Sequence, residues 1–147
     1  MYKRQLQLRA DLRQVPLTLG PGNGASQHLS LIHILGDGVF ELLVRSWLCA
    51  HGVAKSGDLH RATVRHVAAP AQAAFVERIL PVLTPEELAY YKRGRNTHVH
   101  AVPKNATHAQ YAMATGLEAL CGALYLLGAR GRINELFLLG MEETNAL

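Results

Sequence analysis

The sequence has few aromatic residues, few cysteines and no pattern of alternating polar and apolar residues. Aromatic residues make up 6% of the 147 positions, whereas Leu and Ala are abundant, and this composition favours helices over sheets. The two cysteines, Cys49 and Cys121, stand far apart within apolar runs and form no CxxC pair. We therefore expect two buried free thiols in a reducing compartment rather than a disulfide.

Long uncharged apolar runs are also absent. The longest weakly charged run, residues 112–127, contains Glu118 and is too short to cross a bilayer. The basic pair Lys3 and Arg4 is not followed by an apolar stretch, so the sequence predicts no signal peptide. We therefore expect a cytoplasmic protein that does not contact a membrane.

Chain length and net charge limit the kinds of protein that this sequence can encode. A chain of 147 residues is large enough for one domain with a single core. The formal net charge of +4, with eight His residues in addition, is compatible with a polyanionic partner without requiring one.

Hydrophobic periodicity predicts an all-α domain over residues 35–143, followed by a tail at 144–147. Residues 1–34 are poorly specified, because 20–24 is a turn-rich stretch of Gly, Pro and Asn. The peptides MYKRQ and LSLIHI in this segment resemble short reading frames that occur where translated sequence fragments are joined. The segment therefore need not belong to the natural protein. The predicted helices cover residues 37–51, 59–67, 71–80, 85–95, 108–128 and 133–139. Gly52 is the expected C-terminal cap of the first helix, and Ser56 or Asp58 is the expected N-cap of the second. Thr84 is the expected N-cap of the fourth helix, followed by Pro85 and two acids in its first turn.

The first of these helices is predicted to be amphipathic. Asp37, Glu41 and Arg45 recur at i, i+4 and i+8, so they form one polar stripe. Asp37 would lie in the first turn, where the helix dipole favours a negative charge. On spacing alone, the stripe fits an ordinary helix start followed by a Glu–Arg pair. The face expected to point into the core carries Val39, Leu42, Leu43 and Trp47.

Glu118 is the only charged residue in the apolar run at 112–127. A helix that is apolar nearly all round is normally buried. A buried carboxylate must be paired, protonated or bound to a metal, because a bare one costs on the order of several kcal/mol. A structural pair with Arg or Lys and a metal site are both compatible with the sequence. Gly116 and Gly122 in the same helix predict a close approach by another helix.

If Asp37 and Glu118 meet, they would form a site for a hard divalent cation such as Mg²⁺. Mg²⁺ takes oxygen ligands, often only one or two from protein, with water completing its shell. Such a metal can activate water and stabilise in-line displacement at a phosphodiester. The sequence itself does not show that the two helices bring these residues together.

The densest basic segment lies between residues 92 and 105. The alternative to phosphate binding is a solvated charge run at a helix end, where cations offset the dipole. Because the segment continues past the helix into a loop, we favour phosphate binding. His98 and His100 lack the spacing and the companion ligands of a zinc site. The side chains expected to bind RNA phosphates are Lys92, Arg93, Arg95, Lys104 and Asn105.

Taken together, these residues resemble Mini-ribonuclease III, the branch of the ribonuclease III family that consists of the nuclease domain alone. The matching segments occur in the family's order and at its approximate spacing. They are residues 36–41 (GDGVFE) with Val44 and Arg45, 58–60 (DLH), 92–96 (KRGRN), 103–105 (PKN), and 115–120 with Gly122.

The resemblance implies an all-helical, dimer-forming endonuclease domain that cuts double-stranded RNA with Mg²⁺, with one active site in each subunit. Asp37 matches the family's catalytic aspartate and Glu118 its metal-binding glutamate, whereas we expect a structural role for Glu41. Two further acids of the full-length family are replaced here by His33 and Thr115. Threonine at the second of these positions agrees with the mini branch.

The resemblance further implies precursor 23S ribosomal RNA as the substrate, and hence a role in ribosome biogenesis. No double-stranded-RNA-binding domain is expected after the nuclease domain. The surface of the homodimer, or a ribosomal protein that presents the RNA, would therefore hold the substrate. The alternative is a catalytically silent helical dimer that binds structured RNA or a ribosomal partner through the basic segment. Retention of both acids favours the enzyme.

Overall fold

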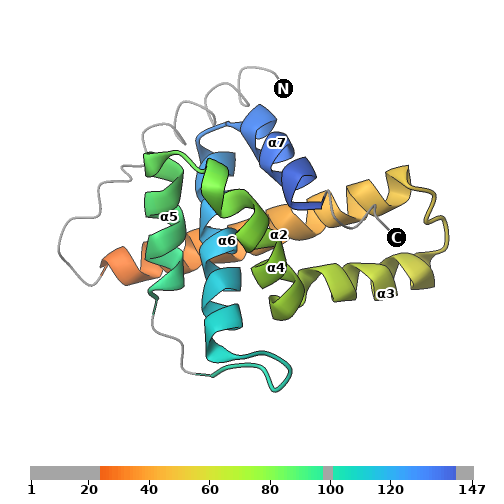
Figure 1. Cartoon of the computed structure of the whole chain (residues 1–147), viewed down its shortest axis with the longest axis horizontal. Helices are drawn as coiled ribbons and strands as arrows, with labels where there is room; N and C mark the ends of the chain where they lie inside the picture. Colours follow the sequence, from red (N-terminus) through yellow and green to blue (C-terminus); the bar gives the residue numbers. More distant parts are fainter. Residues whose placement is uncertain (1–23, 98–100, 142–147) are drawn as a thin grey trace.

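The computed structural model describes residues 24–97 and 101–141, with side chains from residue 31 onward. Within these ranges all regular elements are helices and no strand is present, so the predicted all-α class is confirmed. None of the described helices is long and apolar enough to span a membrane. The elements, labelled as in Figure 1, are α2 (Gly24–Ala50), α3 (Ser56–Val67), α4 (Ala69–Ile79), the short 3₁₀ helix η1 (Leu80–Val82), α5 (Pro85–Arg95), α6 (His108–Leu126) and α7 (Arg130–Met141).

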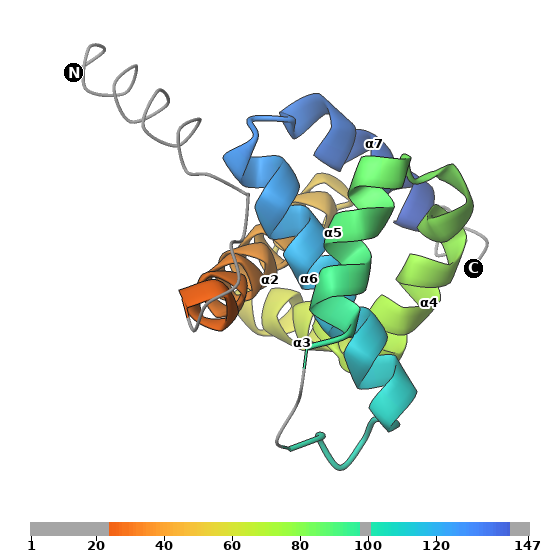
Figure 2. The ribbon, with the colours of Figure 1, turned by 90° about the vertical axis from the view of Figure 1, so that its left-hand side faces the viewer.

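The other helices are arranged around α6. This helix packs against α2, α4, α5 and α7. Figure 2 shows α5 beside α6, with α2 crossing on its other side. From Ala114 to Leu124 every residue of α6 except Glu118 is buried. The all-round apolar character of this stretch therefore reflects a central position in the fold.

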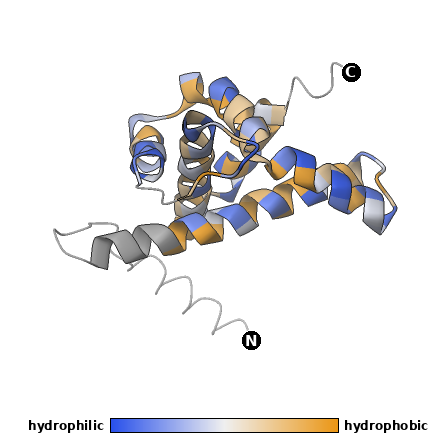
Figure 3. Cartoon of the chain, turned by 90° about the horizontal axis from the view of Figure 1, so that it is seen from below, coloured by the Kyte–Doolittle hydropathy of each residue, from blue (hydrophilic) through white to orange (hydrophobic). Residues whose placement is uncertain are grey.

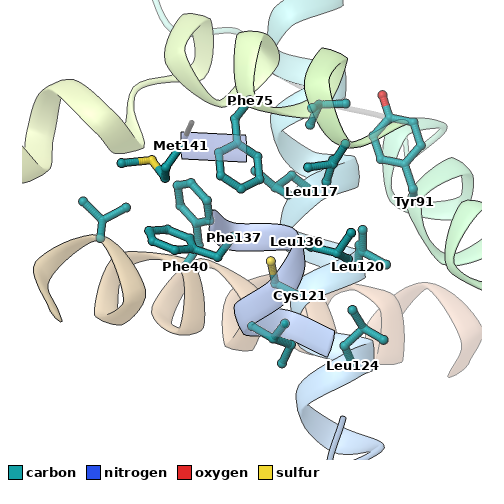
Figure 4. Close-up of a cluster of buried hydrophobic side chains, with 14 of the residues drawn as sticks. Phe40, Phe75, Tyr91, Leu117, Leu120, Cys121, Leu124, Leu136, Phe137 and Met141 are labelled. Carbon is teal, nitrogen blue, oxygen red and sulfur yellow. The ribbon is translucent and has the colours of Figure 1, made fainter. Parts of the chain in front are cut away.

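The core lies where α2, α4, α6 and α7 meet. The three phenylalanines of the chain contact one another there, with the ring centroids of Phe40 and Phe75 5.2 Å apart and those of Phe40 and Phe137 6.0 Å apart. Figure 4 shows these rings packed among leucines of α6 and α7. Each such aromatic pair contributes about 0.5–1.5 kcal/mol beyond its buried area. The scarce phenylalanines are thus concentrated at the junction that holds α2 against α6.

Reciprocal capping boxes begin α5 and α6. The Thr84 hydroxyl accepts from the Glu87 backbone N–H (3.2 Å), and the Glu87 carboxylate accepts from the Thr84 backbone N–H (2.9 Å). The predicted start of α5 is therefore confirmed. Thr107 and Gln110 form the same pair at the start of α6, with distances of 3.1 and 3.0 Å. This second box was not predicted, although its T-x-x-Q pattern is visible in the sequence.

The turn between α2 and α3 is partly as predicted. Gly52 has a positive φ of 91° and lies two residues after Ala50, the last residue of α2, as expected of a C-terminal cap. The predicted N-cap of α3 was wrong, because Lys55 occupies that position and no side chain caps the helix. Ser56 and Asp58 lie inside the first turn instead.

α2 differs most from its prediction. It begins at Gly24 rather than at residue 37, so Asp37 lies in the middle of the helix and the argument from the helix dipole does not apply to it. Leu42, expected in the core, is 65% exposed. Val39, Leu43 and Trp47 are only partly buried against the core. The fully buried row is one residue further round the helix and consists of Phe40, Val44 and Leu48.

The two cysteines differ in burial. Cys121 is buried, as expected, but Cys49 is exposed, so that part of the prediction was wrong. Burial, followed by the nearby charge of Glu118, raises the pKa of Cys121 to about 12. Its thiol therefore stays protonated at neutral pH and is a packing group rather than a nucleophile.

Candidate active site at the crossing of α2 and α6

Two glycines allow α2 and α6 to touch through their backbones. A Cβ atom at Gly36 would lie 1.6 Å from the backbone oxygen of Glu118, and one at Gly122 would lie 2.2 Å from the backbone oxygen of Ile32. No side chain fits at either position. The close approach predicted at Gly122 is therefore confirmed, and its neighbour is α2.

This crossing positions both predicted acids. Asp37 follows Gly36 directly and is exposed. Glu118 supplies the backbone oxygen that faces Gly36, and its own side chain is recessed, with 12% of its surface exposed. The crossing thus holds one carboxylate that is open to solvent and one that is largely covered.

His33 connects the two acids. It lies on α2 one turn before Asp37, and its Nε2 contacts the Glu118 carboxylate in an ion pair. The hydrogen bond to Glu118 raises the pKa of His33 above its ordinary value of 6.5, burial lowers it, and the charges of Glu118 and Asp37 raise it further. The effect of Asp37 means that its carboxylate also lies within electrostatic range of the imidazole.

The partner of Glu118 was not predicted. The sequence left open an Arg or Lys as its structural partner, and the observed partner is a histidine from the segment expected to precede the domain. The only local signal was the i, i+4 spacing of His33 and Asp37 on one helix. The contact with Glu118 depends on how α2 crosses α6, which no local pattern contains.

The acids fit a hard cation with few protein ligands. Mg²⁺ can be held by one or two carboxylates, with water completing its shell, and Asp37 and Glu118 provide such a pair. In the part of the chain that the structure describes, no group of three or more His, Cys, Asp or Glu side chains could hold a metal. A cation would therefore bind mostly through water and would compete with His33 for Glu118.

Two neighbouring positions have structural roles. The Arg45 guanidinium donates from Nε to the Glu41 carboxylate at 2.9 Å, so the expected Glu41–Arg45 pair is confirmed. The Thr115 hydroxyl is buried and donates to the Tyr111 carbonyl oxygen at 3.0 Å. It points along its own helix and adds no free ligand to the site.

The basic end of α5 is fixed against α6 at Ala119, the residue after Glu118. A Cβ at Gly94 would lie 2.4 Å from the Ala119 Cβ, so the two helices are in close contact there. Lys92, Arg93 and Arg95 are exposed around this contact. The Arg95 guanidinium lies over the Tyr91 ring, 5.8 Å from its centroid. Gly116 also faces Tyr91, which confirms the close approach predicted at that glycine.

The loop before α6 carries the remaining basic candidates. Lys104 and Asn105 are exposed in it, and Figures 1 and 2 place this loop on the same side of the molecule as the C-terminal end of α5. His98 and His100 lie outside the described residues. No hydrogen bond or ion pair joins the described part of this loop, residues 101–107, to either acid.

Comparisons with known proteins identify relatives over most of the chain. A family model described as Ribonuclease III domain matches residues 32–129, a range that includes every candidate site residue above. The Mini-ribonuclease 3 of Symbiobacterium thermophilum is 44% identical over 120 residues, covering 82% of this chain and 86% of that protein. The Mini-ribonuclease 3 of Enterococcus faecalis is 40% identical over 110 residues, covering 74% and 83%.

A solved structure extends this similarity to the fold. The crystal structure of a protein from Fusobacterium nucleatum has a TM-score of 0.68 and 27% sequence identity to this chain, and the match covers 77% of this chain and 90% of that one. The arrangement of helices around α6 is therefore shared with an experimentally solved protein.

Proposed function

Since the chain belongs to the ribonuclease III family, we propose that it is a Mg²⁺-dependent endoribonuclease that cleaves double-stranded regions of precursor 23S ribosomal RNA. Endoribonuclease activity follows from the family, whose members act on double-stranded RNA and generally use a divalent metal. The choice of Mg²⁺ and of ribosomal RNA is the proposed part. The resemblance to Mini-ribonuclease III supports it.

The observation that carries the proposal is a helix crossing that carries one exposed and one recessed carboxylate, beside a basic helix end. Asp37 and Glu118 would hold the cation, which supplies a Lewis acid and a readily deprotonated water when bound. The exposed Asp37 carboxylate orients the attacking water toward the RNA. The backbone of Glu118 is held against Gly36 at the helix crossing, and its recessed carboxylate is held in place by the contact with His33.

The exposed cations hold the RNA backbone. The guanidinium groups of Arg93 and Arg95 can each bind a phosphate with paired N–H donors. Lys92 and Lys104 add charge without a fixed geometry, and the Asn105 amide adds a neutral donor. These groups contact phosphate and ribose rather than base edges, so they position a duplex without selecting its sequence.

Cleavage of a duplex RNA in the presence and absence of Mg²⁺ tests the proposal. We expect wild type to cut only with Mg²⁺, and Asp37→Asn to bind the duplex but cut it about a thousand-fold more slowly, because it loses a ligand charge. Glu41→Gln is the matched control, since it removes a carboxylate of the same helix that pairs with Arg45, and it should cut normally. A precursor 23S duplex should be cut faster than an unrelated duplex of equal length. Binding without cutting by both wild type and Asp37→Asn would refute the nuclease assignment.

We also propose that two copies pair through the exposed face of α2. Leu31, Ile34 and Leu42 are 63%, 63% and 65% exposed on this helix, although apolar stripes are uncommon on monomer surfaces. Gly38 lies among them with open space where its Cβ would be, so another backbone can approach closely there. The result would be one active site in each subunit of a homodimer.

Sedimentation of surface variants tests this pairing. Leu42→Glu places a charge in the proposed interface and should convert a dimer into a monomer. Leu138→Glu is the control, because Leu138 is similarly exposed (58%) but belongs to α7. A monomeric wild type, or equal effects of the two variants, would contradict the proposed interface.

A further inference from the structure

α3 carries a second basic surface away from the two acids. His60, Arg61 and Arg65 are exposed and recur at i, i+1 and i+5, which places them on one face of the helix. Lys55, also exposed, immediately precedes α3. The only acidic residue between positions 51 and 68 is Asp58, which forms an ion pair with Arg61. We refer to Lys55, His60, Arg61 and Arg65 as the α3 surface, which has a net positive charge.

The helix that carries the α3 surface is packed against the rest of the domain. The opposite face of the helix buries Ala62 and Thr63, and the Thr63 hydroxyl donates to the Leu59 carbonyl oxygen at 2.7 Å. His66 lies beside the indole of Trp47 in α2, with ring centroids 6.0 Å apart. Because α3 is packed against α2 in this way, its exposed cations keep their position relative to the candidate active site.

The helix α3 lies on the same side of the molecule as the other basic segments. In Figures 1 and 2, α3, the C-terminal end of α5 and the loop before α6 all lie toward the bottom of the view. Figure 3, seen from below, shows α3 beside the C-terminal half of α2, with hydrophilic residues along it. From Asp37 to the end of α2 is about 20 Å at 1.5 Å per residue. The turn that leads to α3 is therefore about 20 Å from Asp37, within reach of a duplex that extends past the cleaved bond.

We propose that the α3 surface binds phosphates of the RNA duplex beyond the region that is cut, and so extends the footprint of the enzyme on long duplexes. This inference rests on the proposed function, since it assigns the surface to the same substrate. The phosphate backbone is the partner that fits, because the surface combines several cations with one acid, Asp58, which is paired with Arg61. Arg65 also lies in the last turn of α3, where a cation stabilises the helix dipole. A purely structural role would affect stability but not RNA binding.

Binding of two labelled duplexes in EDTA, one of about 30 and one of about 10 base pairs, tests the proposal, because double-stranded-RNA-binding modules typically contact about 16. Arg65→Ala should weaken binding of the long duplex by about three- to ten-fold and reduce the salt slope by about 1. The short duplex should be bound as by wild type. Arg130→Ala is the matched control, an exposed arginine at the start of α7, and should change neither.

Asp58→Asn should strengthen RNA binding, a result that partial unfolding of the variant cannot produce. It removes the acid that pairs with Arg61, so it should tighten binding of the long duplex, with melting curves close to wild type. Equal binding by Arg65→Ala and Arg130→Ala, or equal weakening on both duplexes, would overturn the proposal. If the wild-type protein binds both duplexes but cuts neither, the proposed nuclease function is wrong. The binding comparison between the variants would still decide whether α3 binds RNA.

Discussion

Glu87 in α5 and Glu118 in α6 are both recessed glutamates, but they have different partners. The Glu87 side chain, 8% exposed, accepts hydrogen bonds from Nε and Nη2 of Arg132 at 2.8 and 3.0 Å and from the Thr84 backbone N–H. The Glu118 side chain, 12% exposed, has His33 as its ion-pair partner. The two carboxylates have similar exposure, so burial alone does not distinguish their roles.

The partner makes the difference. Arginine remains charged at all accessible pH values and binds a carboxylate through a rigid pair of donors. Its hydrogen bond, against the opposing effect of burial, holds the pKa of Glu87 below its ordinary value. Glu87 therefore has the structural Arg pair that the sequence left open for Glu118. Histidine can lose its charge near neutral pH, so Glu118 is the recessed acid whose partner the proposed cation would displace.

Replacing each glutamate by glutamine should give the largest difference between the two sites, and that difference is in the rate of RNA cleavage. Glu118→Gln removes a proposed metal ligand and should reduce the single-turnover cleavage rate by about a thousand-fold, or about 4 kcal/mol of transition-state stabilisation. Glu87→Gln removes the same charge from the structural pair and should leave this rate within about two-fold. Both rates are measured at saturating duplex RNA. If Glu87→Gln loses as much of the cleavage rate as Glu118→Gln, both carboxylates support activity only by stabilising the fold.

The same two variants should rank in the opposite order in stability. Glu87→Gln should lower the free energy of unfolding by about 2 kcal/mol, less than for a fully buried pair because Arg132 is 27% exposed, and Glu118→Gln by less than about 1 kcal/mol. Since the pKa of Glu87 is lowered from 4.5, its contribution is present above that value and is lost as pH falls through the lowered one. Urea unfolding over an acid pH series should therefore show wild type losing stability more steeply than Glu87→Gln. Parallel curves would contradict this account.

Local patterns in the sequence predicted much of the fold. The Thr84 capping box, the C-terminal cap at Gly52 and the close approach at Gly122 each depend on a few neighbouring residues and were confirmed. The buried row of α2 was predicted one residue away from the observed one. Both rows are apolar at helical spacing, so only the position of α6 decides that Phe40 is covered and Leu42 is not.

The site was harder to predict than the helices that form it. Glu118 was selected as the only charge in an apolar run and Asp37 through the resemblance to the ribonuclease III family, and their assigned chemistry stays a prediction. Their placement at one helix crossing depends on Gly36, which allows the backbones of α2 and α6 to touch. The role of His33 depends on the same crossing. Contacts between residues distant in the sequence require the packed structure, and periodicity contains no information about them.

His33→Ala should give the smallest effect and the sharpest distinction between the two glutamates. Because Glu118 raises the pKa of His33 above 6.5, their pair contributes fully below that pH and is lost as pH rises through the raised value. The variant should therefore be less stable than wild type by less than about 1 kcal/mol in mildly acid solution, since the His33 side chain is 30% exposed, and equally stable in alkaline solution.

Metal binding should change in the opposite direction. Removing the imidazole frees the Glu118 carboxylate, so calorimetric titration with Mg²⁺ should show tighter binding to His33→Ala than to wild type at mildly acid pH. The two affinities should converge as pH rises, because wild-type His33 then loses its charge and its hold on Glu118 weakens. If both proteins bind Mg²⁺ equally across this range, His33 and a cation do not compete, and the His33–Glu118 pair is as structural as Glu87 with Arg132.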